Sequence, residues 1–517
     1  MGVFRNLLLS TSAAGFAIAS ASCQPSDPSQ ACSLLKQTFP NATLLPEDEG
    51  YKAENEASWS SGAWLSPACV VMPKGANELS SIIKTLSQTS TRFSMRGGGH
   101  MPIADAANIN STGVLISSTN LNTLQLSEDK ETMSVGPGPR WGDVFEYMDG
   151  SNMTVVGGRL APVGVPGLLL GGGISYYSYK LGLGASKGKI KAYEAVLADG
   201  TIATVTADNE YADLHWALGG GGNSFALITR FDLQTFYAPT PLVANAVYEG
   251  DPNATRDAYI DTLVNFANNG DQDTGAAIIP VIRWGPNYTS PSYEATLFYN
   301  GTTAPTSGPF ADFYSGATLK AVNESSTLQP QTLADNARLL RPAFQAGGPG
   351  HGFRQKFRVV PCKATKEAAR IVHDNFFDTL AANGLADRAP GFFAGLAFNA
   401  VTPTMARESA GLPQNIPQEA AFWVEQSISW SDATDDAEIE EWLVTADAAM
   451  EEQLKAINGT NRYLYLNDAD VGQDVFERYG KESVNRLKAI RDKYDPGRVY
   501  TDLMPGGFKI DAARDVE

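Results

Sequence analysis

The sequence contains little of what several kinds of site and partner require. Its 517 residues include only 4 cysteines and 4 histidines and form no CxxC or HxxxH pair, so we expect no metal site. It has 39 basic and 57 acidic side chains and no basic cluster, and a net charge of −18 argues against nucleic-acid binding. After the first 21 residues, no stretch is long and apolar enough for a membrane helix. We therefore expect neither nucleic acid nor membrane among its partners.

Two common nucleotide-binding fingerprints are also missing. No GxGxxG opens a helix with an acidic residue some 20 positions later, as a Rossmann site requires. The Walker pattern GxxxxGK[ST] does not occur. Any nucleotide bound by this chain must therefore be held by another arrangement.

The first 21 residues have the pattern of a cleavable signal peptide. Arg5 precedes an apolar run with small residues at its end, and this run is too short and too rich in serine and alanine to span a bilayer. Asn-X-Ser/Thr sequons are numerous, as in a glycoprotein; they begin at Asn41, Asn110, Asn152, Asn253, Asn287, Asn300, Asn323 and Asn458. We expect a protein that is secreted or stays in the secretory pathway.

The cysteines are too few for a dense disulfide scaffold. In an oxidising compartment, Cys32 and Cys69 are the preferred pair. Their bridge would tie an N-terminal arm, residues 22–65, to the first domain. We expect Cys362 to be unpaired.

The rest of the chain divides into three stretches by its hydrophobic pattern. Residues 66–236 alternate strands with helices, among them a helix at 76–89 and a strand at 92–96. Residues 237–461 alternate apolar strands with helices, which indicates an antiparallel sheet with helices on one face. Residues 462–517 contain a tyrosine-rich loop and one helix. The pattern predicts an α+β fold.

The glycines are concentrated in a few runs. One run, Arg96-Gly97-Gly98-Gly99-His100, directly follows a predicted strand, and the others lie at 136–138, 157–173 and 219–222. Consecutive glycines let backbone N–H groups converge on an anion such as phosphate. Because the flanking segments are apolar strands, a binding site is favoured over flexible surface loops.

Several motifs occur in a characteristic order: RGGGH, VGVPG followed by LLLGGGIS, EAVLADG, DLHWALGGGGNSFALITRF and, near the C-terminus, KYDPGRVYTDLMPGGFK. Together they resemble the FAD-linked oxidoreductases of the vanillyl-alcohol oxidase/PCMH type, in the berberine-bridge-enzyme-like branch and its fungal members. The resemblance implies a two-part PCMH-type FAD-binding domain at 66–236 and an α+β substrate domain at 237–461. It also implies that the C-terminal segment, 462–517, packs back on the FAD domain.

The resemblance implies FAD as the cofactor. His100 stands where this family joins its histidine covalently to the flavin, and Leu160 stands where many members attach a cysteine, so we expect a single covalent link. The implied cofactor contacts are Arg96, Gly97, Gly98, Gly99, His100, Met101, Gly138, Val163, Gly164, Gly167, Gly171, Gly172, Gly173, Gly222, Asn223, Ile228 and Asn467.

The sequence departs from the family pattern at two places. Gly188 and Lys189 replace the usual Asp-Asn before the EAVLADG strand, while Ser224 and Ala226 stand where relatives commonly carry Asn and Gly. Weaker FAD binding and a compensated loop are both compatible with these changes.

A flavin enzyme needs a base to take the proton while the substrate carbon loses a hydride. The candidates are Tyr465 and Tyr463, in a loop that resembles the family's YxNxxD segment, and Glu425 on a predicted strand. A tyrosine has a pKa of about 10, so its surroundings must lower that pKa before it can serve as a base near neutrality.

Three functions remain open. The first is oxidation of a small organic substrate, an alcohol or a secondary-metabolite intermediate, by a monomeric enzyme whose flavin is reoxidised by O₂ to give H₂O₂. The second is an extracellular carbohydrate oxidase, which predicts an open groove lined by aromatic side chains. The third is a flavoprotein cyclase or a degenerate, non-catalytic flavin-binding protein.

Overall fold

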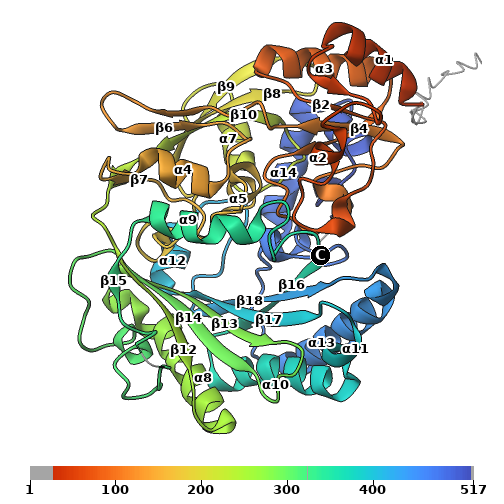
Figure 1. The fold of residues 1–517 in the computed structure, drawn as a ribbon. Helices are drawn as coiled ribbons and strands as arrows, with labels where there is room; N and C mark the ends of the chain where they lie inside the picture. Colours follow the sequence, from red (N-terminus) through yellow and green to blue (C-terminus); the bar gives the residue numbers. More distant parts are fainter. Residues whose placement is uncertain (1–26, 323, 514–517) are drawn as a thin grey trace, which may run out of the picture.

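The computed structural model describes residues 27–322 and 324–513. Two sheets from the first half of the chain lie above one large sheet from its middle (Figure 1), and the predicted α+β fold is confirmed. The predicted signal peptide and the sequon at Asn323 fall outside the described residues. Within the described part of the chain, no helix has the length and apolar character that crossing a membrane requires.

The first sheet is small and has the order β1-β2-β4-β3. Strands β2, β4 and β3 are parallel, and β1 pairs antiparallel with β2. The parallel connection from β2 to β3 runs through α3, whose apolar face is buried against the sheet. The element bounds are β1 Thr43–Leu44, β2 Cys69–Val71, β3 Arg92–Arg96, β4 Gly113–Ser117, α1 Ser29–Thr38, α2 Tyr51–Asn55 and α3 Ala76–Gln88.

A disulfide joins the N-terminal arm to this sheet. Cys32 in α1 is bonded to Cys69 in β2, with their Cα atoms 5.9 Å apart, as the sequence predicted. Cys362 is buried and unpaired, which confirms the second expectation about the cysteines.

The second sheet is antiparallel throughout, with the order β5-β6-β10-β8-β9. Its strands are β5 Leu124–Leu126, β6 Thr132–Val135, β8 Ile190–Val196, β9 Ile202–Thr206 and β10 Leu227–Gln234. A two-stranded ribbon, β7 Met153–Thr154 with β11 Phe236–Tyr237, leads toward the third sheet. The accompanying helices are α4 Trp141–Met148, α5 Val165–Leu170, α6 Ser178–Leu181 and α7 Ala212–Leu218.

The third sheet has seven antiparallel strands in the order β15-β12-β14-β13-β17-β18-β16. The long helices α8, α10 and α13 cover one face (Figure 1), so the predicted one-sided arrangement is confirmed. The strands are β12 Leu242–Tyr248, β13 Ala276–Trp284, β14 Ser292–Tyr299, β15 Gln329–Pro330, β16 Arg354–Lys363, β17 Phe393–Val401 and β18 Ala421–Trp430. The helices are α8 Pro252–Asn269, α9 Leu333–Phe344, α10 Lys366–Asn383, α11 Leu385–Arg388, α12 Pro403–Glu408 and α13 Asp436–Ala456.

The C-terminal segment packs back on the first half of the chain, as predicted. The Tyr494 hydroxyl, at the end of α14 (Lys481–Tyr494), donates to Asp213 in α7 at 2.7 Å. The Tyr500 hydroxyl donates to the carbonyl of Val196 in β8 at 2.8 Å. Both contacts join residues about 300 positions apart in sequence, so the chain end closes the fold around the second sheet.

Candidate functional site

A cavity of about 270 Å³ lies where the glycine-rich loops meet the third sheet and the C-terminal segment. Glycines and apolar side chains form most of its wall, and a few polar groups lie among them. A concave, largely apolar wall with few polar groups is typical of a small-molecule or cofactor site.

Most residues predicted for the site line this cavity. The predicted cofactor contacts in its wall are Gly97, Gly98, Gly99, His100, Met101, Val163, Gly164, Gly167, Gly171, Gly222, Asn223, Ile228 and Asn467, and the candidate bases in its wall are Tyr465 and Glu425. These residues come from loops and strands more than 350 positions apart. The fold therefore gathers the sequence motifs at one place.

Four predicted cofactor contacts and one candidate base lie outside the cavity wall. Gly138 faces the backbone, since a Cβ there would lie 2.5 Å from the Ser118 carbonyl oxygen. Gly172 and Gly173 have φ values of +110° and +84°, so they serve the turn that follows α5. Arg96 and Tyr463 are held in separate networks.

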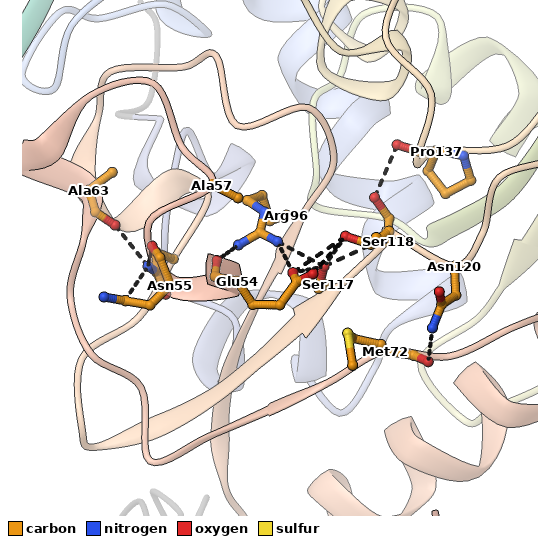
Figure 2. A network of polar contacts seen from close by, with 12 residues as sticks. Glu54, Asn55, Ala57, Ala63, Met72, Arg96, Ser117, Ser118, Asn120 and Pro137 are labelled. Carbon is orange, nitrogen blue, oxygen red and sulfur yellow. Dashed lines mark hydrogen bonds and ion pairs between the residues drawn. The ribbon is translucent and has the colours of Figure 1, made fainter. Parts of the chain in front are cut away.

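The Arg96 side chain is buried in an ion pair with the N-terminal arm (Figure 2). Its guanidinium pairs with Glu54 in α2 and donates to the Ser117 hydroxyl of β4 at 2.8 Å. The same hydroxyl donates to Glu54 at 2.7 Å. Arg96 thus fixes the start of the glycine run to the N-terminal arm, and its side chain does not face the cavity.

Tyr463 is fully buried, and its ring lies 4.6 Å, centroid to centroid, from that of Trp423 in β18. Burial raises its pKa well above the usual value, and the nearby Tyr479 and Tyr465 add to the rise. A phenol with a raised pKa and no cavity surface is unsuited to be the base, so the structure argues against this candidate.

The glycine-rich loops pack directly on one another. A Cβ on Gly98 would lie 2.4 Å from the Gly164 Cα atom, and a Cβ on Gly97 would lie 2.4 Å from Pro166 Cγ. Only glycine permits this approach, because ordinary carbon contacts are longer. The close contact brings the loop after β3 and the start of α5 together as one wall of the cavity.

His100 ends the glycine run with its ring held between aromatic side chains. It stacks on Trp59 of the N-terminal arm with ring centroids 4.2 Å apart, and Phe344 and Phe357 lie against it. Burial lowers its pKa to about 3, and the nearby Arg140 cation adds to this, so the imidazole is neutral at physiological pH. Its buried Nδ1 makes no hydrogen bond within the described residues.

The opposite side of the site carries Glu425, Asp468 and Arg159 in the cavity wall. Burial raises the pKa of Glu425 to about 7, against the opposing effect of the Arg159 and Arg283 cations. Burial and the Glu425 carboxylate raise the pKa of Asp468 well above its usual value. Two carboxyl groups that share a low-dielectric site cannot both ionise easily, so this pair holds a proton near neutrality.

Tyr465 is held by its neighbours rather than prepared for proton transfer. Its hydroxyl accepts hydrogen bonds from the Ile174 backbone N–H at 3.0 Å and from Asn467 Nδ2 at 2.9 Å. Burial raises its pKa above the usual value. Of the three predicted candidates for the base, Glu425 is the one whose pKa and position fit the role.

The departures from the family pattern are partly explained. Gly188 and Lys189 do not line the cavity, and Gly188 is an exposed turn residue with a φ of +78°. The Ser224 hydroxyl accepts a hydrogen bond from the Ile510 backbone N–H at 3.2 Å, which ties the C-terminal segment to this loop. Ala226 lines the cavity, as does Leu160.

The site fits FAD on the structure's own features. The glycine wall exposes backbone to the cavity, and a neutral, rigidly stacked imidazole with a free nitrogen stands beside it. Three contributors were missed from the sequence: Trp59, Asp468 and Asn399, whose side chain accepts from Arg159 at 2.6 Å and donates to Asp468 at 3.2 Å. Asp468 adjoins Asn467 in a loop already marked by its tyrosines, whereas Trp59 and Asn399 carry no local signal.

The fold and the cavity define a flavoprotein of the PCMH type, and comparisons with known proteins agree. Residues 67–206 match a family model described as an FAD binding domain. The chain is 32% identical over 497 residues to the FAD-dependent monooxygenase prx3 of Penicillium roqueforti, and the aligned region covers 93% of each chain.

Solved structures show the same fold at low sequence identity. Glucooligosaccharide oxidase from Acremonium strictum, described with a 6-S-cysteinyl, 8α-N1-histidyl FAD, gives a TM-score of 0.72 at 18% identity over 92% of this chain and 100% of its own. A variant of berberine bridge enzyme also gives a TM-score of 0.72, at 17% identity over 93% of this chain and 99% of its own. The chain therefore has the PCMH-type fold of these enzymes, and its similarity to prx3 along nearly the whole chain shows that it belongs to the FAD-dependent oxidoreductases.

Proposed function

We propose that the protein oxidises a small organic substrate of secondary metabolism, an alcohol or a pathway intermediate, and that O₂ reoxidises its flavin to give H₂O₂. The similarity to a fungal FAD-dependent monooxygenase along nearly the whole chain supports a flavin enzyme that uses O₂. The observation that carries the proposal is the position of Glu425, a carboxyl group with a pKa of about 7, in the same cavity as His100.

His100 would hold the cofactor through one covalent bond to the flavin. Its imidazole is neutral, so a ring nitrogen keeps its lone pair, and stacking on Trp59 fixes the direction of the ring. The glycine wall, with Gly98 and Gly164 in contact, would lie along the cofactor. Leu160 provides no sulfur in the cavity wall, which supports a single link.

When bound, FAD supplies the acceptor for the hydride that leaves the substrate carbon. Glu425 takes the proton from the substrate hydroxyl or amine, because a base with a pKa near the working pH combines availability with proton affinity. Tyr465 and Asn467 form a fixed hydrogen-bonded edge beside it. The apolar remainder of the wall would offer few polar groups to hold water beside the reacting atoms.

The covalent link is tested on the purified protein. We expect a yellow protein whose colour stays with the polypeptide after acid precipitation, and a flavin-bearing peptide that contains His100. His100→Ala should release its flavin on acid treatment, whereas His351→Ala, at a histidine outside the cavity wall, should retain it. Colour lost from the wild-type protein on precipitation would refute the link.

The reaction is tested by peroxide release across sugars, alcohols and pathway intermediates. Turnover of alcohols or intermediates with stoichiometric H₂O₂ supports the proposal, and turnover of sugars alone would favour a carbohydrate oxidase. Incorporation of ¹⁸O from ¹⁸O₂ into the product would instead show a monooxygenase. Anaerobic conversion with unchanged flavin absorbance would show a cyclase. Glu425→Gln serves as the control, because any peroxide that it still releases at the wild-type rate does not come from turnover through this base.

We further propose that the protein is a secreted, glycosylated monomer. The supporting observations are the signal-like N-terminus, the sequons and the Cys32–Cys69 disulfide. Cleavage near residue 21, a mass reduced by glycosidase and a monomeric elution volume are the expected results. Retention in the cytosol with an intact N-terminus would refute the first part.

A further inference from the structure

Arg159 is a cation in the cavity wall without an acidic partner. Among the described residues, no carboxylate oxygen lies within 4.0 Å of its guanidinium nitrogens, the distance of an ion pair. Its buried Nη1 makes no hydrogen bond there either. Buried charged donors are normally paired, because leaving one without an acceptor is strongly unfavourable.

The guanidinium is nevertheless held in a fixed direction. Its Nη2 donates to Asn399 Oδ1 at 2.6 Å, and Asn399 Nδ2 donates in turn to Asp468 at 3.2 Å. Asn399 lies on β17 and is 2% exposed, so the third sheet positions a side chain that belongs to the glycine-rich loop. A side chain fixed in this way keeps its other nitrogen available for a ligand.

The acids near Arg159 carry little negative charge near neutrality. Burial raises the pKa of both Glu425 and Asp468, so near neutrality the pair carries less than its full negative charge. Arg283, the other cation acting on Glu425, already forms an ion pair with Glu294 at 3.0 Å outside the cavity. With Asp468 protonated, Glu425 supplies at most one negative charge against that of Arg159, so the polar end of the cavity has no excess of negative charge to repel an anion.

We propose that Arg159 binds a negatively charged oxygen of the substrate, so that the enzyme selects organic acids: carboxylates, or phenols and enols that ionise. This inference rests on the proposed function, because it assumes that the cavity beside His100 and Glu425 receives a substrate. A guanidinium donates to such an oxygen in a charge-assisted hydrogen bond, which orients the ligand as well as holding it.

The test measures binding of three probes to the flavin-loaded protein by calorimetry. Benzoate is the carboxylate, 4-nitrophenolate is the phenolate, and benzamide is the neutral shape control. We expect at least one anion to bind better than benzamide. The anion that binds more tightly shows whether the site prefers carboxylates or phenolates. In Arg159→Met that anion should bind on the order of ten- to a hundredfold more weakly, with benzamide unchanged.

Two further variants complete the design. Arg159→Lys keeps the charge and should recover part of the anion affinity. Arg388→Met removes an exposed cation that pairs with Glu438 outside the cavity and should leave the anion affinity at the wild-type value. Flavin content, from the absorbance ratio of each purified variant, shows whether Arg159 serves the cofactor instead.

Three outcomes would overturn the inference: no anion preference in the wild type, an unchanged preference in Arg159→Met, or loss of bound flavin in that variant. Calorimetry does not require turnover, so the two proposals fail separately. A protein that binds anions through Arg159 but oxidises nothing refutes the proposed function alone. An active enzyme without anion preference refutes this inference alone.

Discussion

The contact between Gly98 and Gly164 leads to a sharp prediction. In Gly98→Ala the new Cβ would lie 2.4 Å from the Gly164 Cα atom and 2.6 Å from its nitrogen, whereas ordinary contact begins near 3.4 Å. The two loops must therefore separate by about 1 Å. Both neighbours are backbone, so no side chain can rotate away. Overpacking of this kind costs about 1–3 kcal/mol of the free energy of unfolding.

The assay has two readouts, thermal unfolding and flavin content. We expect Gly98→Ala to lower Tm by a few degrees and to purify with less flavin, because the separated loops form the cofactor wall. Gly164→Ala, whose Cβ would lie 2.5 Å from the Gly98 nitrogen, should behave in the same way. Gly75→Ala is the control, since nothing lies within 4 Å of its Cβ. Wild-type Tm and flavin content in both cavity variants would refute the reasoning.

Three further predictions concern the base, the loop beside it and the arm. Activity should rise with pH through about 7, because Glu425 loses its proton there and becomes a base. Glu425→Gln should lose about 10²–10⁴-fold in kcat and show no rise near pH 7. A wild-type pH profile in that variant would contradict the assignment. Tyr465→Phe removes the acceptor for the Ile174 N–H, so kcat should fall while the pH profile keeps its midpoint; a shifted midpoint would instead make Tyr465 the titrating group. Replacing Cys32 and Cys69 by serine opens a loop with a sequence separation of 37. Urea unfolding should show that the free energy of unfolding falls by about 4 kcal/mol, because the bridge no longer constrains the unfolded chain. A fall below about 1 kcal/mol would argue against the bridge as a main constraint.

The sequence predicts best where the signal is local. Strand β3 and the glycine run after it are adjacent in the chain, so the position of His100 could be inferred from a few residues. The same holds for β18, whose apolar character, with Glu425 within it, is visible in one segment. The family resemblance added the order of the motifs, which placed the loops around one cavity.

Strand β16 shows what local patterns cannot reveal. It carries the charged residues Lys356 and Arg358, which argue against a buried strand when only the sequence is considered. Their partners lie far along the chain: Arg358 bonds Asp447 in α13 at 2.7 Å and Asp470 in the C-terminal segment at 3.0 Å. A strand neutralised by residues about 90 to 110 positions away does not show an apolar pattern of its own.

The site has the same dependence on distant partners. Asn399 orients Arg159 across 240 positions, and the pKa of Glu425 depends on burial that only the folded chain provides. Tyr463 and Tyr465 are similar in sequence context, yet only Tyr465 reaches the cavity. Both rings pack on Trp423, so the folded loop, and not the composition, decides which tyrosine lines the cavity.

The N-terminal arm limits how far the chain can be shortened. Glu54 neutralises the buried Arg96, and Trp59 supports the ring of His100, so both ends of the glycine run rest on residues that precede the domain predicted at 66–236. A truncated protein that begins at residue 66 would leave a buried guanidinium without its carboxylate, which costs about 3–5 kcal/mol. It would also free the imidazole to rotate. The arm that the sequence sets apart from the FAD domain is therefore indispensable to the cofactor loop, and any minimal version of the enzyme must retain it.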